Sequence, residues 1–325
     1  MRAHHSLTRR SIAGAVLAAP LLGATRISAQ ESTPEAQFRT VTDVYGEVEV
    51  PVNPQRVIVL DGPMLDALLS VGVKPVGATT GFENDPWPAY LGDATEGIEN
   101  VGIITEPNIE KIIAANPDLI ISSKVRHDAI HDTLMEIAPT VFSDTVGATW
   151  RDDYQLYTNA VNKEAAGAEV VAAFDARAEE FKAATADSRA DWEISVIRFL
   201  PDAVRIYRDT GYIGVILNAL DLPRPDSQIA KEGEEFSETI SAEQIQMANG
   251  THLFAYAWGE LEASPAADFV DSGLWGSLEA VQNDAVYWVD DDYWMVGIGY
   301  IAANMVVDEL FAYLVDGEPG VAIPL

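Results

Sequence analysis

The sequence of 325 residues contains no cysteine. Without thiols the chain has no disulfide framework, no thiolate nucleophile and no cysteine-ligated metal. Lipid anchors of exported proteins are attached at an N-terminal cysteine, so the same absence predicts that the chain is not a lipoprotein.

Basic residues are scarce. Lysine and arginine number 20 against 51 aspartates and glutamates, which gives a net charge of −31. A surface this acidic repels phosphate backbones and anionic lipids, so we predict no nucleic-acid partner. The few arginines become informative, because each must have either a local carboxylate or an anionic ligand to neutralise it.

Long apolar runs and catalytic motifs are also missing. Beyond the N-terminal segment no run reaches the ~18 apolar residues of a membrane span. The sequence contains no G-x-x-x-x-G-K-[ST], no G-x-S-x-G and no H-E-x-x-H. We therefore predict no catalytic residues and a protein that is not an enzyme. An enzyme is the alternative from another class, and it would need a nucleophile with a base in reach.

The N-terminus reads as an export signal over residues 1–29. Arg9 and Arg10 lie in its charged part, an apolar stretch covers residues 12–24, and small residues precede a cleavage site after residue 29. The arginine pair resembles a twin-arginine signal, and an ordinary secretory signal is the alternative. Both predict an exported protein of the periplasm or cell surface. Residues 30–39 form a polar tether, and a small hairpin is expected over residues 40–50.

Residues 151–187 are predicted to form a linker helix. Apolar residues recur there in steps of three or four, proline is absent, and Gly167 is the only glycine. One continuous helix over 153–187 would span roughly 50 Å. On both sides short β-like runs alternate with helical patterns. The sequence therefore predicts an α/β protein with two Rossmann-like lobes, residues 40–150 and 188–325, which have mostly parallel central sheets and are joined by one long rigid helix.

Several motifs fall in a specific order on both sides of this helix. They are G-x-x-x-E-P-N-x-E at 102–110, N-P-D-L-I-I at 116–121, I-S-A-E-Q-I at 240–245, W-G-S-L-E-A-V at 275–281 and V-Y-W-V-D at 286–290. Together they resemble the ABC-importer substrate-binding proteins for iron–siderophore complexes, haem and cobalamin. The run 211–223 also resembles a helix of this family, which ends in a leucine, a glycine or polar residue, and a proline, and there Asp221 stands where glycine is commoner.

The resemblance implies a function and partners. It implies a monomer that captures a ferric siderophore between its lobes and delivers it to an ABC permease and its ATPase, with no covalent cofactor. Haem or cobalamin bound by the same fold is the alternative. The resemblance also implies that Glu110 and Glu243, one on each lobe, meet the permease. Their other interpretation is as ordinary glutamates at helix N-termini.

Candidate ligand residues follow the predicted strands, where the loops of the two lobes would face each other. Anionic iron chelates suit guanidinium groups and aromatic faces. An arginine could instead pair with a nearby acid such as Asp128 or Asp209, and an aromatic ring could pack in the core. The candidates are Arg126, Arg198, Arg208, Tyr212, Trp258, Tyr293, Trp294 and Trp87.

A metal ion is the rival ligand within transport. His127 and His131 are four residues apart, a spacing that can ligate a metal on a helix, as a zinc- or manganese-binding importer component would require. The sequence offers no evident third ligand, so we predict no metal site.

Overall fold

The computed structural model describes residues 37–81, 87–259, 261 and 264–319. The predicted export signal, and the tether up to residue 36, lie outside the described residues. Within the described part, no helix combines the length and apolar character needed to cross a bilayer.

The N-terminal hairpin is confirmed. β1 (Phe38–Thr42) and β2 (Glu47–Pro51) pair antiparallel. The Asp43 carboxylate accepts hydrogen bonds from the backbone N–H groups of Tyr45 and Gly46 in the turn, and from that of Phe142 in the first lobe. The same side chain thus shapes the turn and attaches the hairpin to the sheet beside it.

The first lobe is built on a six-stranded sheet in the order β6-β5-β4-β3-β7-β8. All neighbouring pairs are parallel except β5 with β6. The strands are β3 (Val57–Val59), β4 (Gly77–Thr80), β5 (Glu99–Ile103), β6 (Glu106–Pro107), β7 (Leu119–Ser123) and β8 (Thr140–Ser143). The helices are α1 (Gly62–Ser70), η1 (Ala89–Thr95), α2 (Ile109–Ala114), α3 (Lys124–His127), η2 (Asp128–Ile130), α4 (His131–Ile137) and α5 (Trp150–Ala160).

The second lobe has a five-stranded sheet in the order β11-β10-β9-β12-β13. β9, β12 and β13 run parallel, whereas β10 and β11 are antiparallel to their neighbours. The strands are β9 (Ile194–Leu200), β10 (Ala203–Tyr207), β11 (Ser237–Ile240), β12 (His252–Ala257) and β13 (Val286–Trp288). The helices are α6 (Glu164–Ala184), η3 (Arg189–Asp191), α7 (Tyr212–Ala219), η4 (Asp226–Gln228), η5 (Ala242–Ala248), α8 (Ala266–Val270), η7 (Trp275–Ser277), α9 (Glu279–Gln282), the π-helix η8 (Asp292–Val296) and α10 (Tyr300–Leu314).

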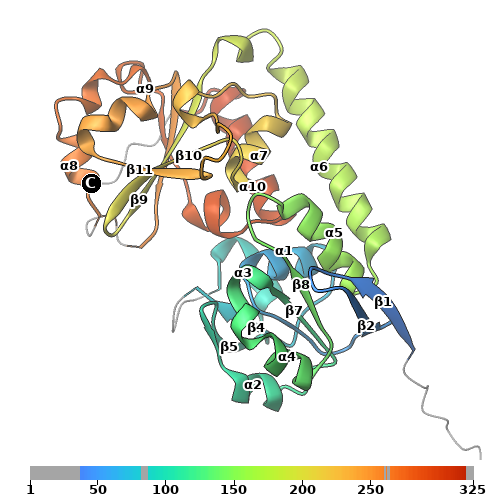
Figure 1. Cartoon of the computed structure of the whole chain (residues 1–325). Helices are drawn as coiled ribbons and strands as arrows, with labels where there is room; N and C mark the ends of the chain where they lie inside the picture. Colours follow the sequence, from blue (N-terminus) through green and yellow to red (C-terminus); the bar gives the residue numbers. More distant parts are fainter. Residues whose placement is uncertain (1–36, 82–86, 260, 262–263, 320–325) are drawn as a thin grey trace, which may run out of the picture. The chain divides into compact units, whose positions relative to one another are not determined.

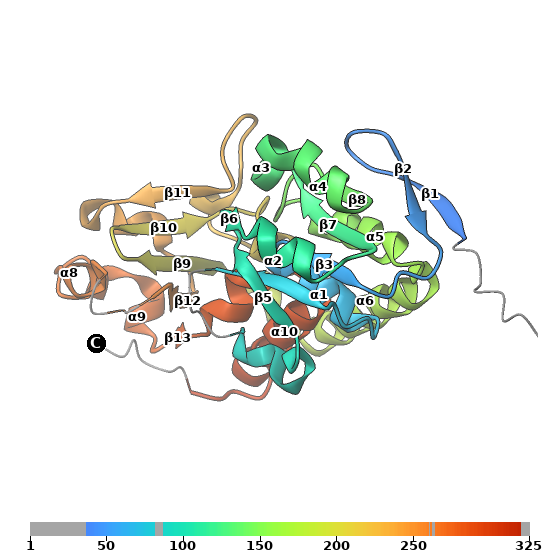
Figure 2. The same ribbon diagram turned by 90° about the horizontal axis from the view of Figure 1, so that it is seen from below.

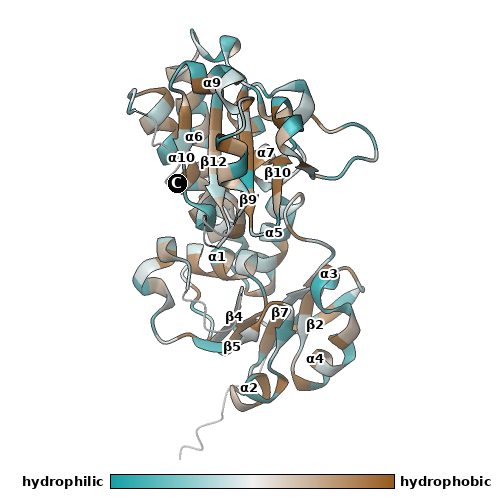
Figure 3. Ribbon diagram, turned by 90° about the vertical axis from the view of Figure 1, so that its left-hand side faces the viewer, coloured by the Kyte–Doolittle hydropathy of each residue, from teal (hydrophilic) through white to brown (hydrophobic). Residues whose placement is uncertain are grey.

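These sheets confirm the predicted α/β class with two lobes (Figures 1 and 2). The strands carry the most hydrophobic residues, and the helices that cover them are more hydrophilic (Figure 3). One buried cluster is confined to the first lobe, around Ile58 and Ile120. A larger one continues from the first lobe into the second through Tyr154 and Tyr300, so the lobes share a packed contact on one side.

The extent of the predicted linker helix is wrong, because the segment is two helices. Between α5 and α6, Asn162 has a φ of 57°. A left-handed residue ends a helix, and asparagine tolerates that conformation better than most. A Cβ at Gly167 would lie 2.9 Å from Thr158 Oγ1, so glycine allows the start of α6 to pack against α5. α6 alone has 21 residues, which corresponds to about 31 Å.

α5 packs on the first lobe, whereas α6 starts against α5 and reaches the second lobe. The Tyr154 hydroxyl on α5 lies 2.9 Å from Ser70 Oγ on α1. On α6, the Phe181 ring packs edge-on against Phe311 of α10, with centroids 5.1 Å apart. The connection between the lobes is therefore α6 together with the bend at Asn162.

Candidate functional site

In the first lobe Arg126 lies on α3, directly after β7. Its Nε is 3.1 Å from Asp61 Oδ2, and Asp61 also accepts the backbone N–H of Gly62 at the start of α1. Burial raises the pKa of Asp61, and the positive charge of Arg126 opposes that rise. The Arg126 side chain is 40% exposed, and among the described residues no group accepts from its two terminal nitrogens. Arg126 is thus anchored at one end and available at the other.

In the second lobe Arg198, near the end of β9, is paired with an acid. Its Nε and Nη2 each lie 2.6 Å from one oxygen of Asp291, and both residues are buried. The guanidinium carbon is 5.6 Å from the centroid of the Trp258 ring, which is a cation–π geometry. Burial raises the pKa of Asp291 to about 6 although Arg198 lowers it. Of the two interpretations given for each arginine, Arg198 therefore shows the ion pair, and its partner is Asp291.

The structure adds one arginine that we did not predict. Arg205 on β10 stands directly opposite Arg198 in the antiparallel pair, so both side chains lie on one face of the sheet. Arg205 is half-buried, and it forms no ion pair or side-chain hydrogen bond with the residues that the structure describes. Its flanking residues, Val204 and Ile206, are buried on the other face. That alternation within a strand was the available signal.

Arg208 is occupied by its own lobe. Its Nη2 bonds Glu238, its Nε lies 3.5 Å from Glu234, and its Nη1 donates to the Glu235 carbonyl at 2.7 Å. Only 8% of the side chain is exposed. These contacts attach β11 and the segment before it to the end of β10, so we withdraw Arg208 as a ligand residue.

Two predicted aromatic contacts are core residues. Tyr212 is 2% exposed and donates its hydroxyl hydrogen to the Gly299 carbonyl. Trp294 is fully buried, stacks on Phe254 and donates from Nε1 to Glu309. Neither ring is accessible to a ligand, because both residues are buried. Tyr212 and Trp294 are therefore core residues and not ligand contacts.

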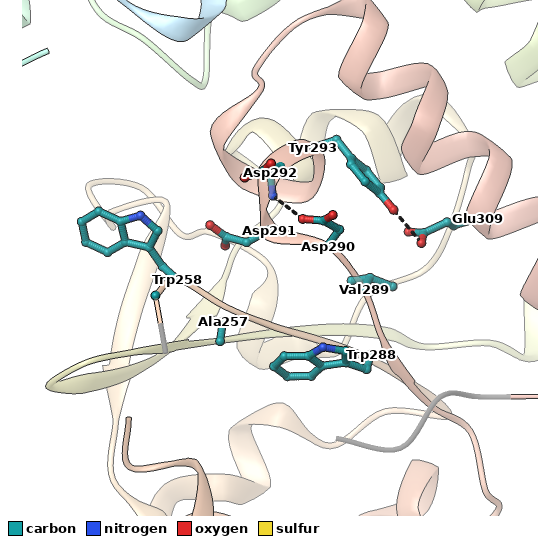
Figure 4. Close-up of a pocket in the computed structure, with 10 residues that line it drawn as sticks. Ala257, Trp258, Trp288, Val289, Asp290, Asp291, Asp292, Tyr293 and Glu309 are labelled. Atoms are coloured by element: carbon teal, nitrogen blue, oxygen red, sulfur yellow. Dashed lines mark hydrogen bonds between the residues drawn. The ribbon is translucent and has the colours of Figure 1, made fainter. Parts of the chain in front are cut away.

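Trp258 and Tyr293 remain accessible in part. They line a pocket of about 450 Å³ at the carboxyl ends of β12 and β13 (Figure 4). In this pocket Asp291 points to the side of Trp258, and the Tyr293 hydroxyl donates to Glu309 at 2.8 Å. The remaining lining residues are Ala257, Gly259, Trp288, Val289, Asp290 and Asp292.

The charge of this pocket does not suit the predicted ligand. Four of its lining residues are acidic, so its floor repels an anion. We therefore place the candidate site on the neighbouring face with Arg198 and Arg205, and assign Trp258 to the border between the two. Trp87 is half-buried against the core. Its role as a ligand residue remains a prediction.

The structure places the two histidines in different surroundings. α3 ends at His127 and α4 starts at His131, so they do not share one helix. His127 is buried between Ser122 Oγ and the Ile104 carbonyl, and burial lowers its pKa. His131 contacts Asp132 and the Tyr45 ring. Among the described residues no group of three or more His, Cys, Asp or Glu could hold a metal ion.

Glu110 and Glu243 are both exposed, one on each lobe. Glu110 lies in the first turn of α2, whose N-cap is Asn108. Glu243 lies in the first turn of η5 and accepts from Ser241 Oγ at 2.7 Å, a hydrogen bond that lowers its pKa. Both carboxylates are presented to solvent, as either interpretation requires.

Comparison with known proteins adds to this geometry. A family model described as periplasmic binding protein matches residues 57–293. The "Probable siderophore-binding lipoprotein YfiY" of Bacillus subtilis is 37% identical over 92% of this chain and 94% of its own length. The Fe(3+)-citrate-binding protein YfmC of Bacillus subtilis is 30% identical over 79% of each chain. The crystal structure of Staphylococcus aureus SirA complexed with staphyloferrin B superposes with a TM-score of 0.78 at 29% identity, covering 85% of this chain and 98% of SirA.

One of these relatives corrects a prediction. We expected an exported protein that is not a lipoprotein, because the sequence has no cysteine. YfiY, which matches nearly the whole chain, is named a lipoprotein. The prediction is therefore wrong, since lack of cysteine in these 325 residues does not decide how a member of this group is held outside the cell.

Proposed function

Because the chain belongs to the periplasmic binding protein family, we propose that it is the extracytoplasmic substrate-binding component of an ABC importer and that it captures an anionic iron(III)–siderophore complex. The observation that carries the ligand class is the pair Arg198 and Arg205 on one sheet face, where Asp291 forms an ion pair with Arg198 and Arg205 has no ion pair among the described residues. That face keeps one uncompensated positive charge.

The first lobe supports the same ligand class. Arg126, anchored by Asp61, adds to Arg205 a second partly exposed guanidinium, which lies on the first lobe. A guanidinium binds a carboxylate through two parallel hydrogen bonds, which fixes orientation as well as charge. The ligand is a chelate that presents carboxylates outward, as ferric citrate does.

The named relatives support this chemistry. One is named for Fe(3+)-citrate, and the SirA structure contains staphyloferrin B. The iron is cargo and is held by the siderophore, so the protein needs no metal ligands of its own. The alternative of a zinc- or manganese-binding component lacks support, because both ring nitrogens of the buried His127 are already hydrogen-bonded, to Ser122 Oγ and to the Ile104 carbonyl.

We also propose the role of the partner contacts. The exposed Glu110 and Glu243 would meet basic residues of the permease, one contact for each lobe. The chain would act as a monomer, and transport energy would come from the ATPase. The chain itself would catalyse nothing.

The experiment is native mass spectrometry of the purified protein, to identify a retained ligand, followed by tryptophan fluorescence titration. Ferric citrate, a ferric catecholate, a ferric hydroxamate, haem and cobalamin are compared. Trp258 reports directly, since its ring stacks on Arg198. The proposal is supported if ferric citrate quenches the fluorescence at a lower concentration than each of the other ligands. Binding of haem or cobalamin in preference would replace it by the alternative within the same fold.

A further inference from the structure

A carboxylate of the first lobe is buried at the start of a helix of the second lobe. Asp66 lies on α1 and has no exposed surface. Its Oδ1 accepts the backbone N–H of Ile301, and its Oδ2 accepts that of Ala302, both at 3.0 Å. The Tyr90 hydroxyl of η1 donates to Oδ2 at 3.2 Å. Three donors from two lobes thus converge on one side chain.

The helix that receives Asp66 has no cap of its own. The first N–H groups of any helix lack partners within the helix and need an acceptor, preferably an anionic one. The N-cap of α10 is Gly299, which has no side chain to supply it. A Cβ at Gly299 would lie 2.2 Å from Asp66 Oδ1. Glycine is needed there because the carboxylate of the other lobe occupies the space of a capping side chain.

This arrangement favours one relative position of the two helices. A buried carboxylate is costly unless its hydrogen bonds are complete. Burial raises the pKa of Asp66 to about 6, against the effect of its backbone donors. A displacement of α10 by an ångström or two would break both backbone hydrogen bonds and leave the charge buried.

The same helix is tied closely to the ligand face. Asp291, the partner of Arg198, is followed at once by the π-helix η8 and then by α10. The connecting Ile298 has a φ of 43°, a strained value for a β-branched residue. A Cβ at Gly297 would lie 2.7 Å from the Tyr90 hydroxyl, so this segment also packs tightly against the first lobe.

We propose that Asp66 is a positioning residue that fixes the lobes relative to each other by capping α10 across the interface. It thereby sets where the lobe with Arg126 stands relative to the lobe with Arg198 and Arg205. Only this consequence for ligand binding rests on the proposed function. The cap across the interface is independent of any ligand.

The test uses the absence of cysteine. Spin labels at Glu136→Cys on α4 and Glu279→Cys on α9, both exposed, give the distance distribution between the lobes without ligand. Asp66→Ala is expected to broaden or shift this distribution. The matched control is Asp153→Ala, which removes a carboxylate that is also buried but bonds only Thr149 within its own lobe. The control is expected to keep the wild-type distribution. An unchanged distribution in Asp66→Ala would overturn the proposal.

Two further measurements keep the proposal testable if Asp66→Ala fails to fold. Gly299→Ala retains the carboxylate but displaces it, and it is expected to shift the distribution in the same way, whereas a wild-type distribution would count against the cap. Hydrogen exchange at the Ile301 and Ala302 amides is expected to accelerate about tenfold or more in either variant, relative to amides later in α10. Loss of ferric citrate affinity should accompany the shift. If the wild-type protein binds no ferric chelate, the proposed function fails while the distance result still decides the cap.

Discussion

Arg205 and Arg198 face each other across β9 and β10, and Asp291 pairs with only one of them. Like charges directly opposite in a sheet repel, so the acid relieves the pair without neutralising it. The remaining positive charge is the feature that distinguishes this face in a chain of net charge −31.

Arg205→Gln is expected to weaken ferric citrate binding about tenfold or more, equivalent to ~1.4 kcal/mol, because a charge-assisted contact is lost. Stability should change little, since Arg205 has no partner among the described residues to leave behind. Fluorescence titration and thermal unfolding measure the two effects. Lys74→Gln, which removes the same charge from an exposed site whose amine bonds the Glu96 carbonyl, serves as the control. Equal affinities for both variants and the wild type would remove Arg205 from the site.

Arg198→Ala is expected to destabilise the fold by about 3–5 kcal/mol, because it leaves Asp291 buried and unpaired. The double change Arg198→Met with Asp291→Leu should recover most of that stability without recovering ligand binding. Urea unfolding of the three proteins gives the comparison. If the single variant is as stable as the wild type, the ion pair has no structural role.

Asp153 gives a prediction for pH. Burial raises its pKa to about 6, and Asp152 and Asp144 add to the rise while the Thr149 hydrogen bond opposes it. A folded pKa above the unfolded value means that this group's contribution to stability is complete below about pH 4 and is lost as pH rises through about 6. The loss amounts to up to about 3 kcal/mol, since each pKa unit corresponds to about 1.4 kcal/mol.

Asp153→Asn should remove that dependence. Relative to the wild type, the variant should gain stability between pH 4 and pH 7. Urea unfolding at several pH values measures the difference between the two proteins, in which the titration of Asp66 and Asp291 cancels. A difference independent of pH would show that Asp153 titrates normally.

Charge reversal at Glu110 and Glu243 is expected to abolish uptake of the iron chelate by cells and to leave ligand affinity unchanged. Both side chains are exposed, so the substitutions to Lys should not disturb the fold. Glu47→Lys with Glu180→Lys, at exposed positions outside the family motifs, controls for the change in net charge. Normal uptake by the Glu110 and Glu243 variant would refute the docking role.

Local sequence patterns predicted the hairpin and the class of both lobes. The hairpin expected over residues 40–50 is present as β1 and β2, and short strands alternate with helices on both sides of the linker. The linker was misread because one residue, Asn162, interrupts an otherwise continuous helical pattern. Asp221, where glycine is commoner, does have a φ of 52°, so the departure from the family pattern marks a real left-handed position.

The site was harder to predict, because the partners of its charges are distant in the chain. Arg198 and Asp291 are 93 residues apart, and no local pattern links them. Arg208 was assigned to the ligand although its acids lie on the following segment and strand. Asp66 had a weak signal, a single acid within an apolar helix, but its partners belong to another lobe.

The most direct test of capture between two lobes is the affinity for ferric citrate of the wild type, of Arg126→Gln, of Arg205→Gln and of the double variant. We predict that each single change weakens binding and that the double variant binds least, because Arg126 and Arg205 are contacts from opposite lobes. Wild-type affinity in either single variant would mean that the ligand is not held between the two lobes by these residues.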